Sequence, residues 1–249
     1  MARVALAATI HDDEARLVPA IERHAAQLRA IFDGIALNIT DTTPATVSDA
    51  ARRALGARVL VHAVDESRIG RARRDAVRLA LEFDAPAILY SDFDHLLRWL
   101  ESDEAELRAI LAAQADVDVL VVGRSSHAFA AEPARLRLTE AIVNRIYWTM
   151  TGRSWDLMFA VRRLSRRAAQ TIVASSRIDT LANDVEWPLL AEANALSLGY
   201  APADGLSYRT MEEFGAPADR RDGDPGEWIR RIEFAAQRAA VLRAYLANY

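Results

Sequence analysis

The feature that most constrains the fold of this chain is the alternation of short apolar segments with longer amphipathic segments through its first half. The apolar segments are rich in Val, Ile and Leu and are bounded by turn residues, which predicts β-strands at 4–10, 34–39, 58–64, 87–90 and 117–122. The segments between them have apolar residues at helical spacing, which predicts helices at 15–32, 46–55, 71–82 and 96–114. This order predicts an α/β fold with a mostly parallel sheet and helices on both faces.

The alternation stops near residue 124, and the second half is organised differently. Helices are predicted at 136–151 and 165–174, a late strand at 196–201, a loop at 217–226 and an amphipathic helix at 227–249. One stripe of this last helix consists of Trp228, Ile232, Ala235, Ala239, Leu242 and Leu246. We expect the helix to pack on its own domain or on a second chain, so a homodimer is one expectation.

Composition excludes several classes of protein. The net charge of −4 gives no general attraction for nucleic acid or for an anionic membrane. The absence of cysteine excludes disulfides, thiolate metal sites and a cysteine nucleophile, and it fits a cytoplasmic protein. The apolar N-terminal run is too short for a signal peptide, and no run is long enough to cross a membrane. We therefore expect no nucleic-acid partner and no transmembrane segment, so that any membrane contact would be peripheral.

An acidic pair follows the predicted strand at 87–90. Asp92 and Asp94 form an Asp-x-Asp triplet at its carboxyl end, where an open α/β sheet places its ligand site. Carboxylate oxygens suit a hard divalent cation such as Mg²⁺ or Mn²⁺, which is commonly shared with the phosphates of a nucleotide. We expect Asp94 to bind the metal directly and Asp92 to bind the metal or the ribose. The structural alternative is that the pair caps the following helix.

Two other Asp-x-Asp triplets lack this context. Asp116 and Asp118 come before a strand, at the wrong end for a ligand site, while Asp222 and Asp224 lie in a predicted loop without a preceding strand. The position of the triplet therefore favours Asp92 and Asp94 as the cation site.

A basic helix start precedes the acidic pair. Gly70 is followed by Arg71, Arg73 and Arg74, so that guanidinium groups and helix N-terminal amides would both face a diphosphate. Arg73 is the preferred candidate by position. The alternative is a solvated basic helix whose arginines pair with neighbouring acids.

Asp184 and Glu186 are candidate general bases, because a carboxylate can take a proton from a hydroxyl group. Two residues apart, they share a face in a strand but diverge in a helix. Asp184 is preferred over Glu186, and the structural alternative is a helix cap at Asn183 or Asp184. Among the histidines, we expect His127 to line the cleft and include it as a candidate metal ligand, although no two histidines have the spacing of a compact metal site.

These motifs together resemble those of the GT-A fold nucleotide-sugar glycosyltransferases, specifically the polyprenol-phosphate sugar transferase-like members. The matching segments over residues 3–200 are 9–14, 39–42, 70–76, 92–94, Gly152 with Asp156, and 183–189. The resemblance implies nucleotide binding by Thr9, His11, Asp41, Gly70, Arg71, Arg73 and Asp92. It also implies a domain over 1–215, with a nucleotide-binding half at about 1–124 and an acceptor half at about 125–215, followed by a loop and helix at 216–249.

The implied activity is metal-dependent, inverting transfer of a sugar from a UDP- or GDP-sugar to a small or lipid-linked acceptor. The Gln-x-x-Arg-Trp box of processive members is absent, which argues against polymer synthesis. Two alternatives stay open. One is a non-catalytic relative that binds nucleotide sugars, because a fold does not guarantee a function. The other is a sugar nucleotidyltransferase, against which the first strand argues because it lacks a Gly-rich phosphate loop.

Overall fold

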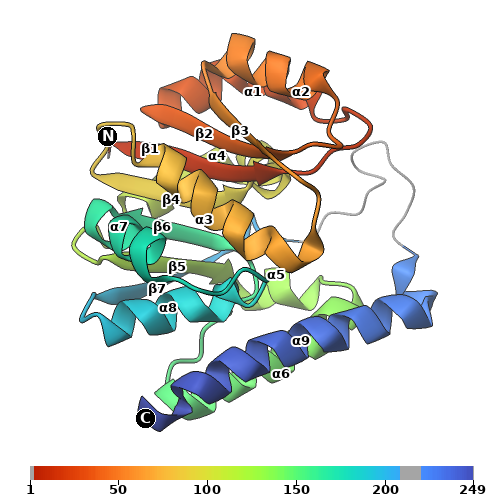
Figure 1. Ribbon diagram of the computed structural model, residues 1–249, viewed down its shortest axis with the longest axis vertical. Helices are drawn as coiled ribbons and strands as arrows, with labels where there is room; N and C mark the ends of the chain where they lie inside the picture. Colours follow the sequence, from red (N-terminus) through yellow and green to blue (C-terminus); the bar gives the residue numbers. More distant parts are fainter. Residues whose placement is uncertain (1–2, 208–219, 249) are drawn as a thin grey trace.

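A computed structural model of the chain describes residues 3–207 and 220–248. A seven-stranded sheet at its centre has the order β3-β2-β1-β4-β6-β5-β7. The strands are β1 (Val4–Ile10), β2 (Gly34–Thr40), β3 (Arg58–His62), β4 (Ala87–Asp92), β5 (Val119–Arg124), β6 (Val161–Ser165) and β7 (Leu198–Ala203). β6 is antiparallel to both of its neighbours, whereas the other strand pairs are parallel. The prediction of a mostly parallel α/β sheet is confirmed (Figure 1).

Helices cover both faces of this sheet (Figure 1). They are α1 (Val18–Ile31), α2 (Ala45–Ala50), α3 (Ile69–Ala80), α4 (Phe93–Ala112), α5 (Ser126–Ala130), α6 (Ala134–Thr151), α7 (Arg166–Ser175), α8 (Asn183–Ala193) and α9 (Pro225–Tyr245). A π-helical turn, Ala51–Leu55, extends α2, and short 3₁₀ turns lie at Glu66–Arg68, Arg221–Gly223 and Leu246–Asn248. None of the described helices is long and apolar enough to cross a membrane.

The sheet separates two hydrophobic cores because successive strand residues point to opposite faces. Leu6 and Ile10 of β1 pack into the core formed with α1 and α4. Ala5, Ala7 and Ala36 point the other way, into the core formed with α3. Small side chains on that face allow α3 to lie close to β1 and β2, which brings the start of α3 to the carboxyl end of β4.

Three elements of the second half, α5, β6 and α8, were not predicted as such. β6 was missed because Arg162 and Arg163 interrupt its apolar pattern. Arg162 is nevertheless buried, since its guanidinium donates to the backbone carbonyls of Leu157, Phe159, Val161 and Asp184. Residues 183–193, for which strand and helix had both been open, form helix α8. Five donors on one side chain allow an arginine to occupy a buried strand when carbonyls surround it.

The predicted stripe of the C-terminal helix faces the core only in part: Leu242 is buried and Ala235 packs against the core, whereas Ile232 and Leu246 do not. The buried residues of α9 are Phe234, Arg238, Val241 and Leu242, of which only Leu242 belongs to that stripe. Ile232 and Leu246 are 59% and 54% exposed. α9 packs against α6 and α8 through its buried face. Of the loop predicted at 217–226, residues 217–219 lie outside the described part of the chain.

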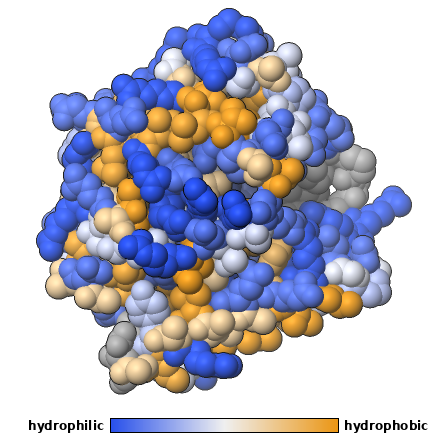
Figure 2. Space-filling view, viewed as in Figure 1, coloured by the Kyte–Doolittle hydropathy of each residue, from blue (hydrophilic) through white to orange (hydrophobic). Residues whose placement is uncertain are grey.

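The outer surfaces of α6 and α9 have apolar side chains. Exposed large apolar residues on and beside these two helices are Leu138, Ile142, Trp148, Ile229, Ile232 and Leu246. Figure 2 shows apolar and polar side chains alternating along the lower edge of the molecule, where α9 runs. A homodimer through this surface stays a prediction, to be tested by the mass of the protein in solution.

Candidate active site

The parallel strands β1, β2 and β4 end at the same edge of the sheet, and their last residues interact. Thr9 is paired with Asp92 in the register of β1 and β4. Thr9 Oγ1 donates a hydrogen bond of 2.9 Å to Asp92 Oδ1, and the Tyr90 hydroxyl donates one of 2.7 Å to the same oxygen. His11 Nδ1 lies 3.0 Å from Thr40 Oγ1. The strand ends thus bring Thr9, His11 and Asp92, which were predicted to bind the nucleotide, to one edge.

Asp92 and Asp94 lie on either side of the junction between β4 and α4. Asp92 Oδ2 is 3.2 Å from Arg73 Nη2, and Asp94 Oδ2 is 3.4 Å from Arg98 Nη2 and 3.9 Å from His95 Nε2. Burial alone would raise the pKa of Asp92, but Arg73 and His95 lower it below its usual value, with help from its hydrogen bonds. Asp92 is therefore ionised at neutral pH, as a cation ligand must be.

The other two Asp-x-Asp triplets have structural roles. Asp118 accepts hydrogen bonds from Ser165 Oγ and from the backbone amide of Ser197. Asp222 accepts from the amide of Ala134 at the start of α6, and Asp224 accepts from the amide of Gly226 at the start of α9. These carboxylates stabilise helix starts and a strand connection, whereas Asp92 and Asp94 face a cavity.

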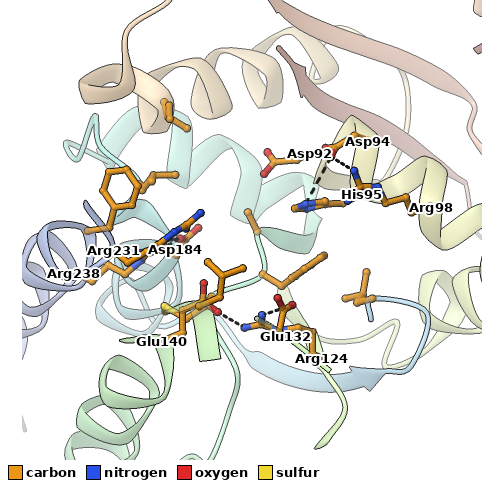
Figure 3. A pocket seen from close by; sticks show the side chains of 18 of the residues that line it. Asp92, Asp94, His95, Arg98, Arg124, Glu132, Glu140, Asp184, Arg231 and Arg238 are labelled. Atoms are coloured by element: carbon orange, nitrogen blue, oxygen red, sulfur yellow. Dashed lines mark hydrogen bonds and ion pairs between the residues drawn. The ribbon is translucent and has the colours of Figure 1, made fainter. Parts of the chain in front are cut away.

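This cavity has a volume of about 450 Å³ and is lined by α3, α4, α6, α8, α9 and the segment before β6. In Figure 3, Asp92, Asp94, His95 and Arg98 lie at one side, whereas Arg231, Asp184 and Arg238 lie at the other. The predicted cation pair and the predicted base therefore line one cavity. A volume of this size fits a small-molecule site.

A chain of buried ion pairs joins the two sides. Arg73 Nη1 donates to Asp184 Oδ1 over 2.6 Å while its Nη2 faces Asp92. Arg238 Nη2 donates to Asp184 Oδ2 over 2.6 Å. Burial lowers the pKa of the Arg73 guanidinium, but Asp92 and Asp184 raise it by more, so its pKa lies above the usual value. Negative and positive side chains therefore alternate in space, in the order Asp92, Arg73, Asp184 and Arg238.

Glu186 is also buried but does not line the cavity. Because residues 183–193 form a helix, Glu186 points away from Asp184. Its carboxylate accepts hydrogen bonds from Ser176 Oγ at 2.6 Å and from the amide of Arg177 at 2.8 Å. Glu186 therefore binds the loop before α8. The helix directs Asp184 and Glu186, the two candidates for the general base, to different surroundings.

The other predicted residues of the basic helix start have different surroundings. A Cβ atom on Gly70 would lie 2.3 Å from the carbonyl oxygen of Thr180, so this glycine allows α3 to approach that loop. Arg71 is exposed, with Asp75 3.8 Å away. Arg74 is buried and bonds to Asp179 and to the carbonyl of Ile178. Of the three arginines, Arg73 lines the cavity.

Of the remaining predicted residues, Thr9 and His11 do not line the cavity, and Asp41 and His127 lie away from it. Asp41 is exposed at the end of β2 and accepts a hydrogen bond of 3.0 Å from the amide of Val64. His127 is exposed on α5, whose start is capped by Ser125, so the helix turns it outward. Neither is among the residues that line the cavity.

A second charge network at the cavity was missed from the sequence. Arg124, at the end of β5, pairs with Glu132 and Glu140 at 2.6 Å and with Asp156 at 2.7 Å, and all four side chains are buried. Burial raises the pKa of Glu140 above its usual value, although Arg124 opposes this effect. The sequence feature that could have indicated this network is an arginine at the carboxyl end of a buried strand. Its three partners are 8 to 32 residues away, so they cannot be chosen from sequence.

The carboxylates at this site suit a divalent cation whose other ligands come from the phosphates of a substrate. Within residues 3–207 and 220–248, no group of three or more His, Asp or Glu side chains has the arrangement of a metal site. Asp92 and Asp94 alone would supply one or two carboxylates. Mg²⁺ is typically bound in this manner, with the remaining ligands from water and substrate phosphates.

No protein-family model and no curated protein matches this sequence. Solved structures do match. Glucosyl-3-phosphoglycerate synthase from Mycobacterium tuberculosis, in complex with phosphoglyceric acid, superposes with a TM-score of 0.59 at 12% identity, over 99% of this chain and 80% of that one. The same enzyme with Mn²⁺, UDP-glucose and phosphoglyceric acid gives a TM-score of 0.56 at 12% identity, with the same coverage. This chain has the GT-A fold of these glycosyltransferases.

Proposed function

We propose that this protein is a metal-dependent glycosyltransferase that moves a sugar from a nucleotide diphosphate sugar to a small or lipid-linked acceptor, with inversion at the anomeric carbon. The observation that supports this most is the cavity in which Asp92 and Asp94 face Asp184, with Arg73 bridging Asp92 and Asp184. Such an arrangement would supply a cation site and a base within one small-molecule site.

The donor is proposed to bind at the carboxyl ends of β1, β2 and β4, where open α/β sheets place ligands. UDP-sugars are the first candidates because structures of similar fold contain UDP or UDP-glucose together with Mn²⁺ or Mg²⁺. Asp94 and Asp92 would hold the cation, which neutralises the diphosphate as it leaves. Arg73 is positioned to replace its contact with Asp92 by one with a phosphate.

Asp184 is proposed as the general base. Its Oδ1 and Oδ2 accept hydrogen bonds from Arg73 and Arg238, which fix the carboxylate in the cavity wall. Each carboxylate oxygen has a second lone pair, so an acceptor hydroxyl can still bind Asp184. The same two ion pairs also favour the alternative that the protein binds a nucleotide sugar without transferring it, since they engage both oxygens.

The experiment is a thermal unfolding series with UDP-, GDP-, CDP- and dTDP-sugars, each with and without Mn²⁺ or Mg²⁺. A ligand that binds the native state raises the unfolding temperature. The wild type is compared with Asp94→Ala and with Asp116→Ala, a matched control in a triplet away from the cavity. We expect one nucleotide class to stabilise the protein, to require the cation, and to lose its effect only in Asp94→Ala.

Product analysis then separates the alternatives. Release of UDP from a donor in the presence of the protein supports transfer chemistry, and its loss in Asp184→Asn but not in Glu186→Gln supports Asp184 as the base. Donor binding without turnover over a panel of acceptors would favour the non-catalytic relative. Release of pyrophosphate from a nucleoside triphosphate and a sugar phosphate would instead identify a nucleotidyltransferase.

A further inference from the structure

One side of α9 supplies a positively charged wall to the cavity. Arg230, Arg231, Phe234 and Arg238 all line it. Figure 3 shows Arg231 and Arg238 across the cavity from Asp94 and His95. The C-terminal helix is thus part of the site, on the side away from the acidic pair that is proposed to hold the donor cation.

Arg231 differs from the other arginines of this cavity because it forms no ion pair or hydrogen bond within the part of the chain that the structure describes. Each of the others has an ion pair or another polar interaction: Arg73, Arg98, Arg124, Arg221, Arg230 and Arg238. Arg231 has neither an ion pair nor a hydrogen bond with any residue in 3–207 or 220–248, and its Nε is buried. Its guanidinium carbon lies 5.8 Å from the centre of the Phe234 ring.

An unpaired guanidinium is costly to shield from water, because burial removes its hydration without supplying a counter-charge. Burial lowers the pKa of Arg231, and Arg230, Arg135 and Arg238 lower it further, whereas Glu140 raises it. Glu140 is itself bound to Arg124, and Asp184 is bound to Arg73 and Arg238. The carboxylates of the cavity are therefore engaged elsewhere, and the α9 wall has excess positive charge.

We propose that Arg231 is an anion subsite, which binds a phosphate or carboxylate group of the sugar acceptor. This inference rests on the proposed function, because it assigns the acceptor to the cavity opposite the donor cation. Guanidinium groups bind carboxylates and phosphates through two parallel N–H donors, and partial shielding from water, as at the half-buried Arg231, strengthens these bonds. The acceptor is then a small anionic hydroxy compound or the phosphate end of a lipid carrier.

The test is calorimetric titration of the full chain with inorganic phosphate, glyceric acid and phosphoglyceric acid, each with and without UDP and Mn²⁺. The variants are Arg231→Gln, Arg231→Lys and Arg243→Gln, the last being an exposed arginine of the same helix. We expect binding of at least one anion to be about 10 to 100 times weaker in Arg231→Gln, as the loss of a charged hydrogen bond predicts. Arg231→Lys retains part of the affinity, and Arg243→Gln retains all of it.

Several outcomes would overturn the inference. Equal affinity in Arg231→Gln, or no anion binding by a wild type that binds UDP and Mn²⁺, refutes the subsite while the proposed function stands. Displacement of the anion by UDP with Mn²⁺ refutes its assignment to the acceptor, since the donor phosphates then occupy Arg231. Anion binding that depends on Arg231 in a protein that binds no nucleotide supports the anion site and counts against the proposed function.

A parallel assay with vesicles distinguishes the two sources of the anion. Sedimentation with vesicles that contain an anionic phospholipid, lost in Arg231→Gln but not in Arg243→Gln, supports the anion subsite and assigns it to a lipid headgroup. Binding of the free anions without binding to vesicles assigns it to a small acceptor. The near-ultraviolet circular dichroism of Arg231→Gln and Arg231→Lys checks that both variants fold.

Discussion

The alternating chain of charges across the cavity predicts a large loss of stability when its central carboxylate is neutralised. Asp184 is 4% exposed, and its partners Arg73 and Arg238 are 4% and 6% exposed. Replacement of Asp184 by Asn preserves the shape of the side chain but removes the counter-charge of Arg238 and leaves Arg73 with Asp92 as its remaining acidic partner among the described residues. Removal of one partner from a buried pair costs about 3–5 kcal/mol. Because Asn keeps one acceptor oxygen, we expect the free energy of unfolding to fall by about 3 kcal/mol, the lower end of this range.

The assay is equilibrium unfolding in urea together with thermal unfolding. For a domain of this size, about 3 kcal/mol corresponds to a midpoint about 6–12 °C lower. Glu186→Gln is the matched control on the same helix, because Glu186 is equally buried but pairs with no arginine side chain in the described part of the chain. The free energy of unfolding of Glu186→Gln is expected to fall by about 1 kcal/mol, the net contribution of a typical hydrogen bond. If Asp184→Asn costs no more than Glu186→Gln, Asp184 is not the counter-charge that stabilises the two arginines, and the reasoning is refuted.

Two further predictions concern packing and pH. Gly70→Ala places a methyl group 2.3 Å from the carbonyl oxygen of Thr180 and should cost about 1–3 kcal/mol in urea unfolding, whereas Gly223→Ala, with open space around it, should be nearly neutral. The raised pKa of Glu140 means that the folded protein binds its proton more tightly than the unfolded chain, so stability falls as pH rises from about 4.5 through the folded pKa. Glu140→Gln should flatten this part of the stability curve, and an unchanged curve would contradict the assignment.

The sequence predicted most of the fold because the strands of a parallel sheet are buried on both faces and are therefore nearly continuous apolar runs. β1, β2, β4 and β5 were recognised on this basis, and their order with the intervening helices indicated the architecture. β6 was missed because a strand that is buried beside carbonyl groups can contain arginines, and hydropathy alone does not register such partners.

At the site, the sequence indicated which residues have suitable chemistry and lie at the carboxyl end of a strand, as Asp92 does. It indicated Asp92 and Asp94 as the candidate cation pair from their position at the end of β4, because strand direction places them at the ligand edge of the sheet. Only the tertiary structure decided that Asp184 faces this pair while Glu186 does not, since helix phase depends on how α8 packs. The tertiary structure also placed Arg231 and Arg238 of α9 in the cavity. Contacts over such sequence distances are set by the packing of the whole domain, and local patterns do not encode them.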